Sequence, residues 1–188
     1  KLSYGLFVLT AREGDKDNGC IVNTVSQVTV SPNRIVVAVN KSNYTHDMIV
    51  SSGMFNVSVL TEKSSFDTYK HWGFQSGRDV DKTKEITFQR AANGIIYIAE
   101  ETNAYLSAKV VSMTDMGTHT LFLADVTEAE VLSQLDLFDA NIYEMADAVK
   151  DVDQGEFTGR LWMLDNRRFY NHGRLNVEPS ANIIDNEN

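Results

Sequence analysis

Apolar and polar side chains alternate along much of the chain with a period of two, the pattern of strands that bury one face. Clusters of turn-forming residues at 13–19, 31–33 and 115–118 interrupt this pattern. In the segment 34–40 all five residues from Ile35 to Val39 are apolar, which predicts a strand buried on both faces. The predicted strands cover residues 4–11, 20–30, 34–40, 54–61, 95–99, 104–114 and 119–129.

Three segments have helical rather than strand spacing. The first begins with Thr45 as a suitable N-cap, has Asp47 in its first turn and ends at Gly53. Residues 64–72 carry three aromatic side chains spaced three apart, which places them on one helical face. Residues 140–149 predict a third helix. Between the last two helices the chain contains a predicted exposed loop at 73–84 and three of the predicted strands.

Many strands joined by short turns, with few helices, argue against alternating strand–helix units. We therefore expect a mainly β, antiparallel fold, closed or nearly closed into a barrel, with a few peripheral helices. A chain of 188 residues suits one domain, and no Pro/Gly/Ser-rich linker divides it. We place the barrel domain in residues 1–150 and a C-terminal extension, packed on the barrel or on a dimer partner, in residues 151–188.

The charge balance limits the partners of this chain. With 17 basic and 26 acidic residues the net charge is −9, which disfavours nucleic acid and anionic membranes as partners. A local group of amides with one lysine can still bind a small anion. No apolar run approaches the roughly 20 residues needed to span a bilayer. Because the sequence begins at Lys1 rather than at a methionine, it is compatible with a missing N-terminal piece, including a removed signal peptide.

The chemistry-bearing residues form no familiar catalytic motif. The single cysteine, Cys20, allows no intrachain disulfide and favours a reducing, cytoplasmic location. The four histidines have no metal-ligand spacing, and we predict no metal site. Glycine-rich phosphate loops and the G-x-S-x-G nucleophile motif are also absent from the sequence. The obvious signatures of hydrolases and metalloenzymes are therefore missing.

Two polar segments remain as candidate binding sites. Asn23, Thr24, Val25, Ser26 and Gln27 place small or polar side chains where a strand would normally carry bulk, so a planar ligand can approach the backbone. An exposed strand face explains the same pattern.

The second candidate segment leads from the predicted strand at 34–40 directly into a helix N-terminus. Asn40, Lys41, Ser42 and Thr45 there combine an amide, an ammonium and two hydroxyls with free backbone N–H groups, the parts of a phosphate site. Ordinary helix capping, with Lys41 solvated, is the alternative interpretation.

The order of several features along residues 4–130 resembles the flavin-reductase-like family with an FMN-binding split barrel. No single feature is specific for this family, but the six features in this order are. They are Asn18-Gly19, the segment 23–26, Ser31-Pro32 before the strand 35–40, the segment 40–49, the strand 54–60 and Gly117-Thr118-His119 before a last strand. The resemblance implies a Greek-key split barrel.

The resemblance also implies a role for each candidate residue. Asn23, Thr24, Val25, Ser26 and Gln27 would line the flavin ring, mostly through backbone groups. Asn40 would lie on the ribityl side, with Lys41, Ser42 and Thr45 at the phosphate. His119 would stand at the open flavin face, where nicotinamide stacks; a half-buried core histidine is the alternative. The loop 74–77 would cover the site.

In function, the resemblance implies a cytoplasmic FMN-binding oxidoreductase. It would be an NAD(P)H-dependent flavin reductase that transfers hydride from NADH or NADPH to flavin N5, and a homodimer with FMN near the subunit interface. The alternative is an FMN-containing electron-transfer protein that a protein partner reduces without nicotinamide. A third alternative is a barrel that lacks the cofactor and serves as an interaction module.

Two departures from the family pattern lie on the nicotinamide side. Residues 117–119 read Gly-Thr-His where the family often has Gly-Asp-His. Residues 74–77 read Phe-Gln-Ser-Gly where the family often has Phe-Ser-Gly. Flavin binding is therefore predicted more firmly than binding of the hydride donor.

Overall fold

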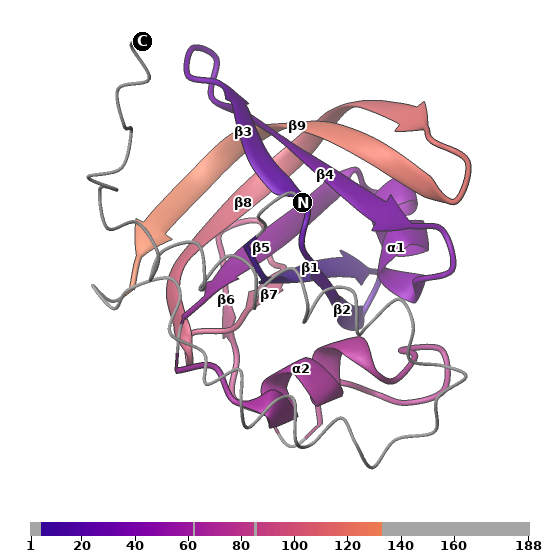
Figure 1. The fold of residues 1–188 in the computed structure, drawn as a ribbon, viewed down its shortest axis with the longest axis vertical. Coiled ribbons are helices and arrows are strands. Elements are labelled where there is room, and N and C mark those ends of the chain that lie inside the picture. Colours follow the sequence, from indigo (N-terminus) through magenta and orange to yellow (C-terminus); the bar gives the residue numbers. More distant parts are fainter. Residues whose placement is uncertain (1–4, 62, 85, 133–188) are drawn as a thin grey trace, which may run out of the picture. The chain divides into compact units, whose positions relative to one another are not determined.

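The structure is a computed structural model that describes residues 5–61, 63–84 and 86–132. It contains a seven-stranded sheet in the order β2-β1-β5-β8-β9-β4-β3, and every neighbouring pair is antiparallel (Figure 1). Its strands are β1 (Phe7–Glu13), β2 (Lys16–Val22), β3 (Val25–Thr29), β4 (Arg34–Asn40), β5 (Met54–Leu60), β8 (Thr102–Asp115) and β9 (His119–Val131). A separate short hairpin pairs β6 (Gln89–Arg90) with β7 (Ile96–Tyr97). The predicted mainly β, antiparallel class is confirmed.

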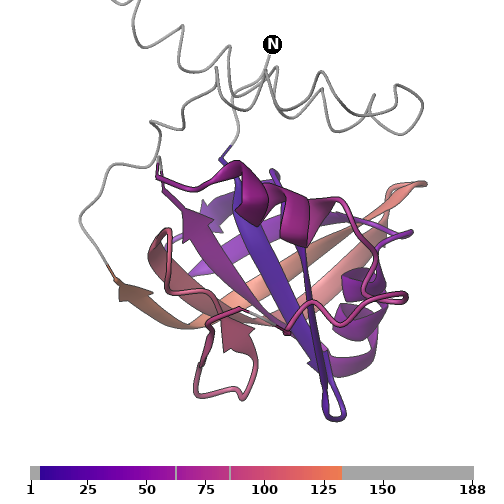
Figure 2. The ribbon, with the colours of Figure 1, turned by 90° about the horizontal axis from the view of Figure 1, so that it is seen from below.

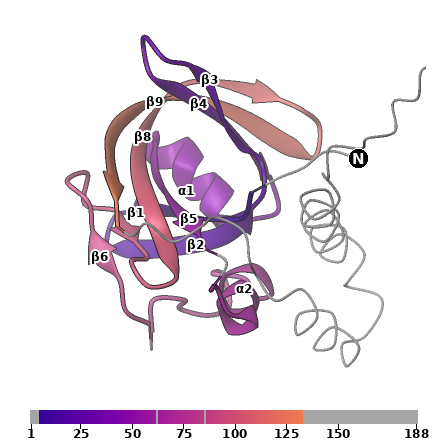
Figure 3. The ribbon, with the colours of Figure 1, turned by 60° about the vertical axis from the view of Figure 1, so that its left-hand side comes forward.

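The connection between β2 and β3 forces the sheet to roll up. These strands lie at opposite edges of the sheet, yet only Asn23 and Thr24 separate them in sequence. Such a connection spans at most about 11 Å. The two edges must therefore approach one another, and the rolled sheet is seen in Figure 3. The segment 23–27 thus begins where the sheet edges meet.

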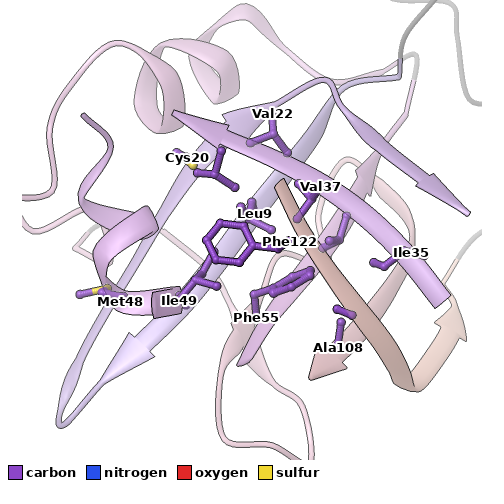
Figure 4. Close-up of a cluster of buried hydrophobic side chains, with 14 residues drawn as sticks. Leu9, Cys20, Val22, Ile35, Val37, Met48, Ile49, Phe55, Ala108 and Phe122 are labelled. Carbon is purple, nitrogen blue, oxygen red and sulfur yellow. The ribbon is translucent and has the colours of Figure 1, made fainter. Parts of the chain in front are cut away.

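One hydrophobic cluster fills the interior of the rolled sheet. Leu9 of β1, Phe55 of β5 and Phe122 of β9 belong to it and are fully buried (Figure 4). Helix α1 (Tyr44–Ser52) contributes Met48 and Ile49 to the same cluster. Because α1 follows β4 directly and is anchored by these side chains, its N-terminus is held rigidly at one end of β4.

Strand β4 differs from its prediction in burial. It alternates between buried residues such as Val37 and half-buried residues such as Val36 and Ala38, so the prediction of two fully buried faces was wrong. The reason is its place in the sheet: β4 lies next to the edge strand β3, and only its inner face meets the core.

The first helix confirms one predicted boundary and corrects the other. Gly53, at φ 69°, ends α1 and donates its N–H to the carbonyl of Ile49. The N-cap is Asn43, however, and Thr45 lies inside the helix with its side chain fully buried. The Thr45 hydroxyl points inward because the first turn of α1 packs against β1 and β2.

Helix α2 (Phe66–Gly73) matches the second predicted helix. Ser65 caps it by accepting a hydrogen bond from the N–H of Thr68. Tyr69 and Trp72 are buried, as the aromatic spacing predicted. The helix packs against β2 (Figure 2), and the Trp72 ring lies so close that a Cβ on Gly19 would come within 2.7 Å of it. Neither helix in the described part of the chain has the length and apolarity to cross a bilayer.

Other boundaries also differ from the sequence prediction. The predicted strand 20–30 is two strands, and the predicted turn 13–19 shrinks because β2 begins at Lys16. Asp17 and Asn18 are polar but buried, and their side-chain partners hold them in the strand. The predicted helix 140–149 and the extension 151–188 lie outside the described residues, so the domain boundary stays a prediction.

Candidate functional site

The end of β4 and the start of β9 meet beside the N-terminus of α1. Asn40 is opposite His119 in the β4–β9 ladder, and the N–H of Lys41 donates to the carbonyl of Thr118 at 3.0 Å. The His119 ring lies 2.9 Å from the Thr118 hydroxyl through Nδ1, and the residue is half-buried. The structure thus brings together the candidate residues of the 40–42 segment and His119.

A tight turn joins β4 to α1. The Asn40 Oδ1 accepts from both the N–H and the hydroxyl of Ser42, each at 2.9 Å. The N–H of Asn43 donates to the Asn40 carbonyl at 3.0 Å. The first N–H groups of the helix, those of Tyr44 and Thr45, have no acceptor within α1 because no turn precedes them. This end of the helix therefore favours an anion.

Three cations surround this helix N-terminus, and the sequence analysis had singled out only Lys41. Lys41 Nζ lies 2.6 Å from the Asp115 carboxylate. Lys16 Nζ lies 4.5 Å from the centroid of the Tyr44 ring, and the Arg78 guanidinium lies 4.9 Å from it. Lys16 and Arg78 come from a strand and a loop remote in sequence, so no local motif could have identified them.

Two carboxylates balance these cations. Asp47 binds both Arg78 and the Nδ1 of His46, and these hydrogen bonds, that of His46 first, lower the pKa of Asp47. The pKa of Asp115 is lowered chiefly by its hydrogen bond with Lys41 and also by the N–H of Gly117. Both carboxylates are therefore charged at neutral pH.

The predicted covering loop is seated directly on this end of α1. Gly77 packs against Asn18 so closely that a Cβ on Gly77 would lie 2.1 Å from the Asn18 Oδ1. Lys16 Nζ donates to the Gly77 carbonyl at 2.9 Å, and Arg78 follows at once. A larger residue at position 77 would clash with the Asn18 side chain of β2, so either this side chain or the loop would have to move.

Thr45 does not share the exposed position of its predicted companions. It is fully buried, and its hydroxyl accepts from the Asn18 Nδ2 at 3.0 Å. Lys41 and Ser42 lie at the surface. The predicted phosphate trio is therefore divided: two side chains face outward, while Thr45 offers only its backbone N–H.

The segment 23–27 is also divided by the structure. The Thr24 hydroxyl donates to the carbonyl of Ala38 at 2.9 Å, which places this end of the segment two residues from Asn40. Gln27 instead pairs opposite Ile35 and hydrogen-bonds Asn33, at the far end of β4. The first residues of the segment thus adjoin the site, and Gln27 points elsewhere.

The side chain of Asn23, where the two edges of the sheet meet, has a buried donor, Nδ2, without a partner among the described residues. A buried donor without an acceptor is costly, which favours a polar ligand at this position. Val25 and Ser26 follow in β3, half-buried and exposed respectively. Their roles in binding stay predictions.

A separate cavity of about 300 Å³ lies beside α2. Asp67, His71 and Trp72 of the helix line it together with Glu100 and Glu101. It contains none of the predicted site residues. Among the described residues no group of histidine, cysteine or acidic side chains has the arrangement to hold a metal ion. The N-terminus of α1 is therefore the stronger candidate site.

Comparison with known proteins identifies the family of this chain. The model of the flavin reductase like domain matches residues 1–144. A ferric-chelate reductase (NAD(P)H) of Archaeoglobus fulgidus is 35% identical over 147 residues, which are 78% of this chain and 84% of that protein. A high molecular weight rubredoxin of Moorella thermoacetica is 41% identical over 133 residues, 71% of this chain. The matched region is only 58% of the length of the Moorella protein.

A solved structure also matches the fold. The crystal structure of flavoredoxin from Methanosarcina acetivorans superimposes with a TM-score of 0.64 at 26% identity, covering 70% of each chain.

Proposed function

Because this chain belongs to the flavin reductase like family, we propose that it is an FMN-binding, NAD(P)H-dependent flavin reductase. The observation that carries the proposal is the N-terminus of α1, where Lys41 and Ser42 lie beside His119 and the first two N–H groups have no acceptor within the helix. The Archaeoglobus relative, whose name includes NAD(P)H, supports a nicotinamide donor. Bound flavin supplies the hydride-accepting chemistry at its N5.

The phosphate of FMN fits the donors at this helix. Lys41 and Ser42 offer an ammonium and a hydroxyl at the surface, and Tyr44 and Thr45 offer backbone N–H groups. Arg78 is a fifth donor, which the loop 74–80 holds over Tyr44. A phosphate monoester accepts several such bonds at once, which favours FMN as the flavin.

The flavin ring is assigned to the side of the site where the sheet edges meet. Asn23 offers a buried Nδ2 without a partner, and the backbone of Thr24, Val25 and Ser26 follows it. Asn40 lies between this segment and the helix, as the ribityl side requires. His119 lies opposite Asn40 across the ladder, and we propose that it contacts the nicotinamide. The chain's task is then to hold two rings in stacking distance and to exclude water.

A homodimer is part of the proposal. Strand β8 extends past its last β5 partner, Lys109, and Val110 still donates its N–H to the carbonyl of Gly53. From Val111 to Asp115 no other strand of the described residues pairs with this edge of β8. Val111 and Met113 on this extension and Met116 in the turn that follows are exposed apolar side chains. An open strand edge with apolar side chains favours pairing with a second copy. We also place the protein in the cytoplasm, where the buried thiol of Cys20 stays reduced.

The test is the visible spectrum of the purified protein, followed by anaerobic addition of NADH or NADPH. We expect a bound yellow chromophore that bleaches with nicotinamide. The double variant Lys41→Ala, Ser42→Ala should weaken FMN binding by about 10- to 100-fold, since a charge-assisted contact is lost. Lys70→Ala on α2 is the matched control and should bind FMN normally. Unchanged affinity in the double variant would remove the phosphate assignment.

The alternative function is that of an FMN-containing electron-transfer protein reduced by a protein partner. The observation in its favour is the Moorella relative, a rubredoxin by name, which extends well beyond the matched region. A flavin that binds but does not bleach with either nicotinamide would favour this alternative. A colourless protein that takes up no FMN would favour the interaction module instead.

A further inference from the structure

Two cations of the site, Lys41 and Arg78, each form an ion pair with a carboxylate of this chain. Lys41 Nζ lies 2.6 Å from Asp115, which stands at the end of β8. Arg78 binds Asp47, which stands in the first turn of α1. Lys41 lies in the turn just before this helix, and Arg78 lies over the ring of Tyr44 in its first turn. Each carboxylate therefore holds a cation that a phosphate at this helix would also contact.

Both ion pairs are exposed to solvent, so each cation can exchange its carboxylate partner for another anion at little cost. The side chains of Lys41 and Asp115 are 37% and 74% exposed, and those of Arg78 and Asp47 are 49% and 47% exposed. Ion pairs of this kind contribute little to folding because water and salt screen them. A dianionic phosphate can thus replace either carboxylate at small cost to the fold.

We propose that Asp47 and Asp115 are affinity-setting residues that compete with the flavin phosphate for Arg78 and Lys41. The inference rests on the proposed phosphate position and adds a role for the carboxylates. With both cations already neutralised, binding must break or share two ion pairs and place negative charges near one another. The pairs therefore keep flavin affinity below the level that the cations alone allow, so that flavin can exchange.

The decisive variant is Asp115→Asn. Asparagine keeps an oxygen for the N–H of Gly117, which Asp115 now holds at 2.8 Å, and removes only the charge. We expect FMN to bind about 3- to 10-fold more tightly, measured as the dissociation constant from quenching of flavin fluorescence. Asp47→Asn should act in the same direction, and the double variant should exceed either one. Removing one partner of a salt bridge ordinarily weakens binding at a site. An increase in FMN affinity would therefore distinguish competition by the carboxylates from a supporting role.

Asp125→Asn is the matched control. Asp125 is 44% exposed and pairs with Arg34 at 2.7 Å. Arg34 opens β4, whereas Asn40 ends it, about 20 Å away at the rise of a strand. The control changes net charge equally and breaks a similar pair, yet should leave FMN affinity within about 1.5-fold. Riboflavin, which lacks the phosphate, is the second control, and its affinity should not change in any variant.

The outcomes separate this inference from the proposed function. A parent protein that binds no FMN overturns the proposed function itself. FMN binding that is unchanged or weakened in Asp115→Asn, or improved no more than in Asp125→Asn, overturns the inference alone. An equal gain for riboflavin also overturns it, because the effect would not depend on the phosphate. Thermal melting shows which variants are folded. If Asp47→Asn does not fold, the FMN affinity of Asp115→Asn alone tests the inference.

Discussion

Two groups of ion pairs in this protein use the same side-chain chemistry in opposite ways. At the β1–β2 hairpin, the side chain of Asp17 is only 5% exposed and both its oxygens bind Arg90, at 3.1 and 2.7 Å. Arg12 adds a third contact at 3.4 Å. At the N-terminus of α1, Asp115 makes an exposed pair with Lys41, and Asp47 makes an exposed pair with Arg78 and a second contact with His46.

Burial decides what each group can do. The carboxylate of Asp17 has lost its water and depends on its cations, so this pair belongs to the fold. Asp115 keeps most of its hydration, and Lys41 loses little when the pair opens. Exposed pairs beside a helix N-terminus can therefore be exchanged for a ligand, and the buried pair cannot. Four experiments can break or sharpen this comparison.

The largest effect is expected from Asp17→Ala. Without the carboxylate, Arg90 and Arg12 lose their partner at a buried position, and the free energy of unfolding should fall by about 3 kcal/mol. Urea denaturation monitored by circular dichroism measures it. Asp115→Ala is the comparison and should lower stability far less. Equal losses in the two variants would show that burial does not distinguish the groups.

Gly77→Ala should affect the site more than the fold. The new Cβ would meet the Asn18 side chain, so the loop 74–80 must lift away from α1 and carry Arg78 with it. We expect FMN affinity to fall about tenfold, equivalent to about 1.4 kcal/mol. At Gly73 the nearest atom to a new Cβ is 3.3 Å away, on the flexible Ile21 side chain, so Gly73→Ala is the control. A Gly77→Ala protein with normal FMN affinity would contradict the seated loop.

The stacked pair Tyr97 and Tyr105 predicts a loss of stability in alkali. Their ring centroids lie 3.8 Å apart, and burial is the main cause that raises the pKa of both phenols. In the unfolded chain tyrosine ionises near pH 10, while the folded pair keeps its protons to higher pH. The stabilisation is therefore complete below about pH 10 and is lost as the pH rises above it.

Tyr105→Phe tests this expectation. It removes the hydrogen bond to Glu128 and should cost about 1 kcal/mol at neutral pH. It should also flatten the alkaline decline in stability, measured by urea denaturation between about pH 9 and 11.5. An equally steep decline in both Tyr105→Phe and Tyr97→Phe would mean that other groups cause it.

The smallest effect is expected from salt. Raising ionic strength from about 0.05 to 0.5 M should weaken FMN binding a few-fold, because the cations of the site are exposed and screened. Riboflavin should be nearly insensitive over the same range. If both flavins respond equally, the phosphate does not lie among these charges.

Local patterns located most elements from the sequence. A run of apolar residues gave the bounds of β4 as observed, and Gly53 marked the end of α1. The break between β2 and β3 was missed, although the two successive polar residues Asn23 and Thr24 interrupt the alternation there. The start of β2 was missed because Asp17 and Asn18, which are typical of turns, are buried here against distant partners.

The candidate site was only partly predictable, because some of its contacts join residues that are far apart in the sequence. Lys41 and Ser42 adjoin a helix start, so a local pattern identified them. Arg78 was missed because its partner Asp47 is 31 residues away, and nothing in the loop around it is periodic. Thr45 was placed on the surface because a hydroxyl near a helix start normally caps it.

The sequence by itself determined the short-range features: the strand period, the helix ends and the ordered set of residues that identifies the family. These depend on neighbours within a few positions, whose effects add along the chain. Only the tertiary structure decided that Lys41 meets Asp115, 74 residues away, and that Thr45 faces inward. Strand register and the packing of α1 set those contacts, and both depend on how the whole sheet closes around its core.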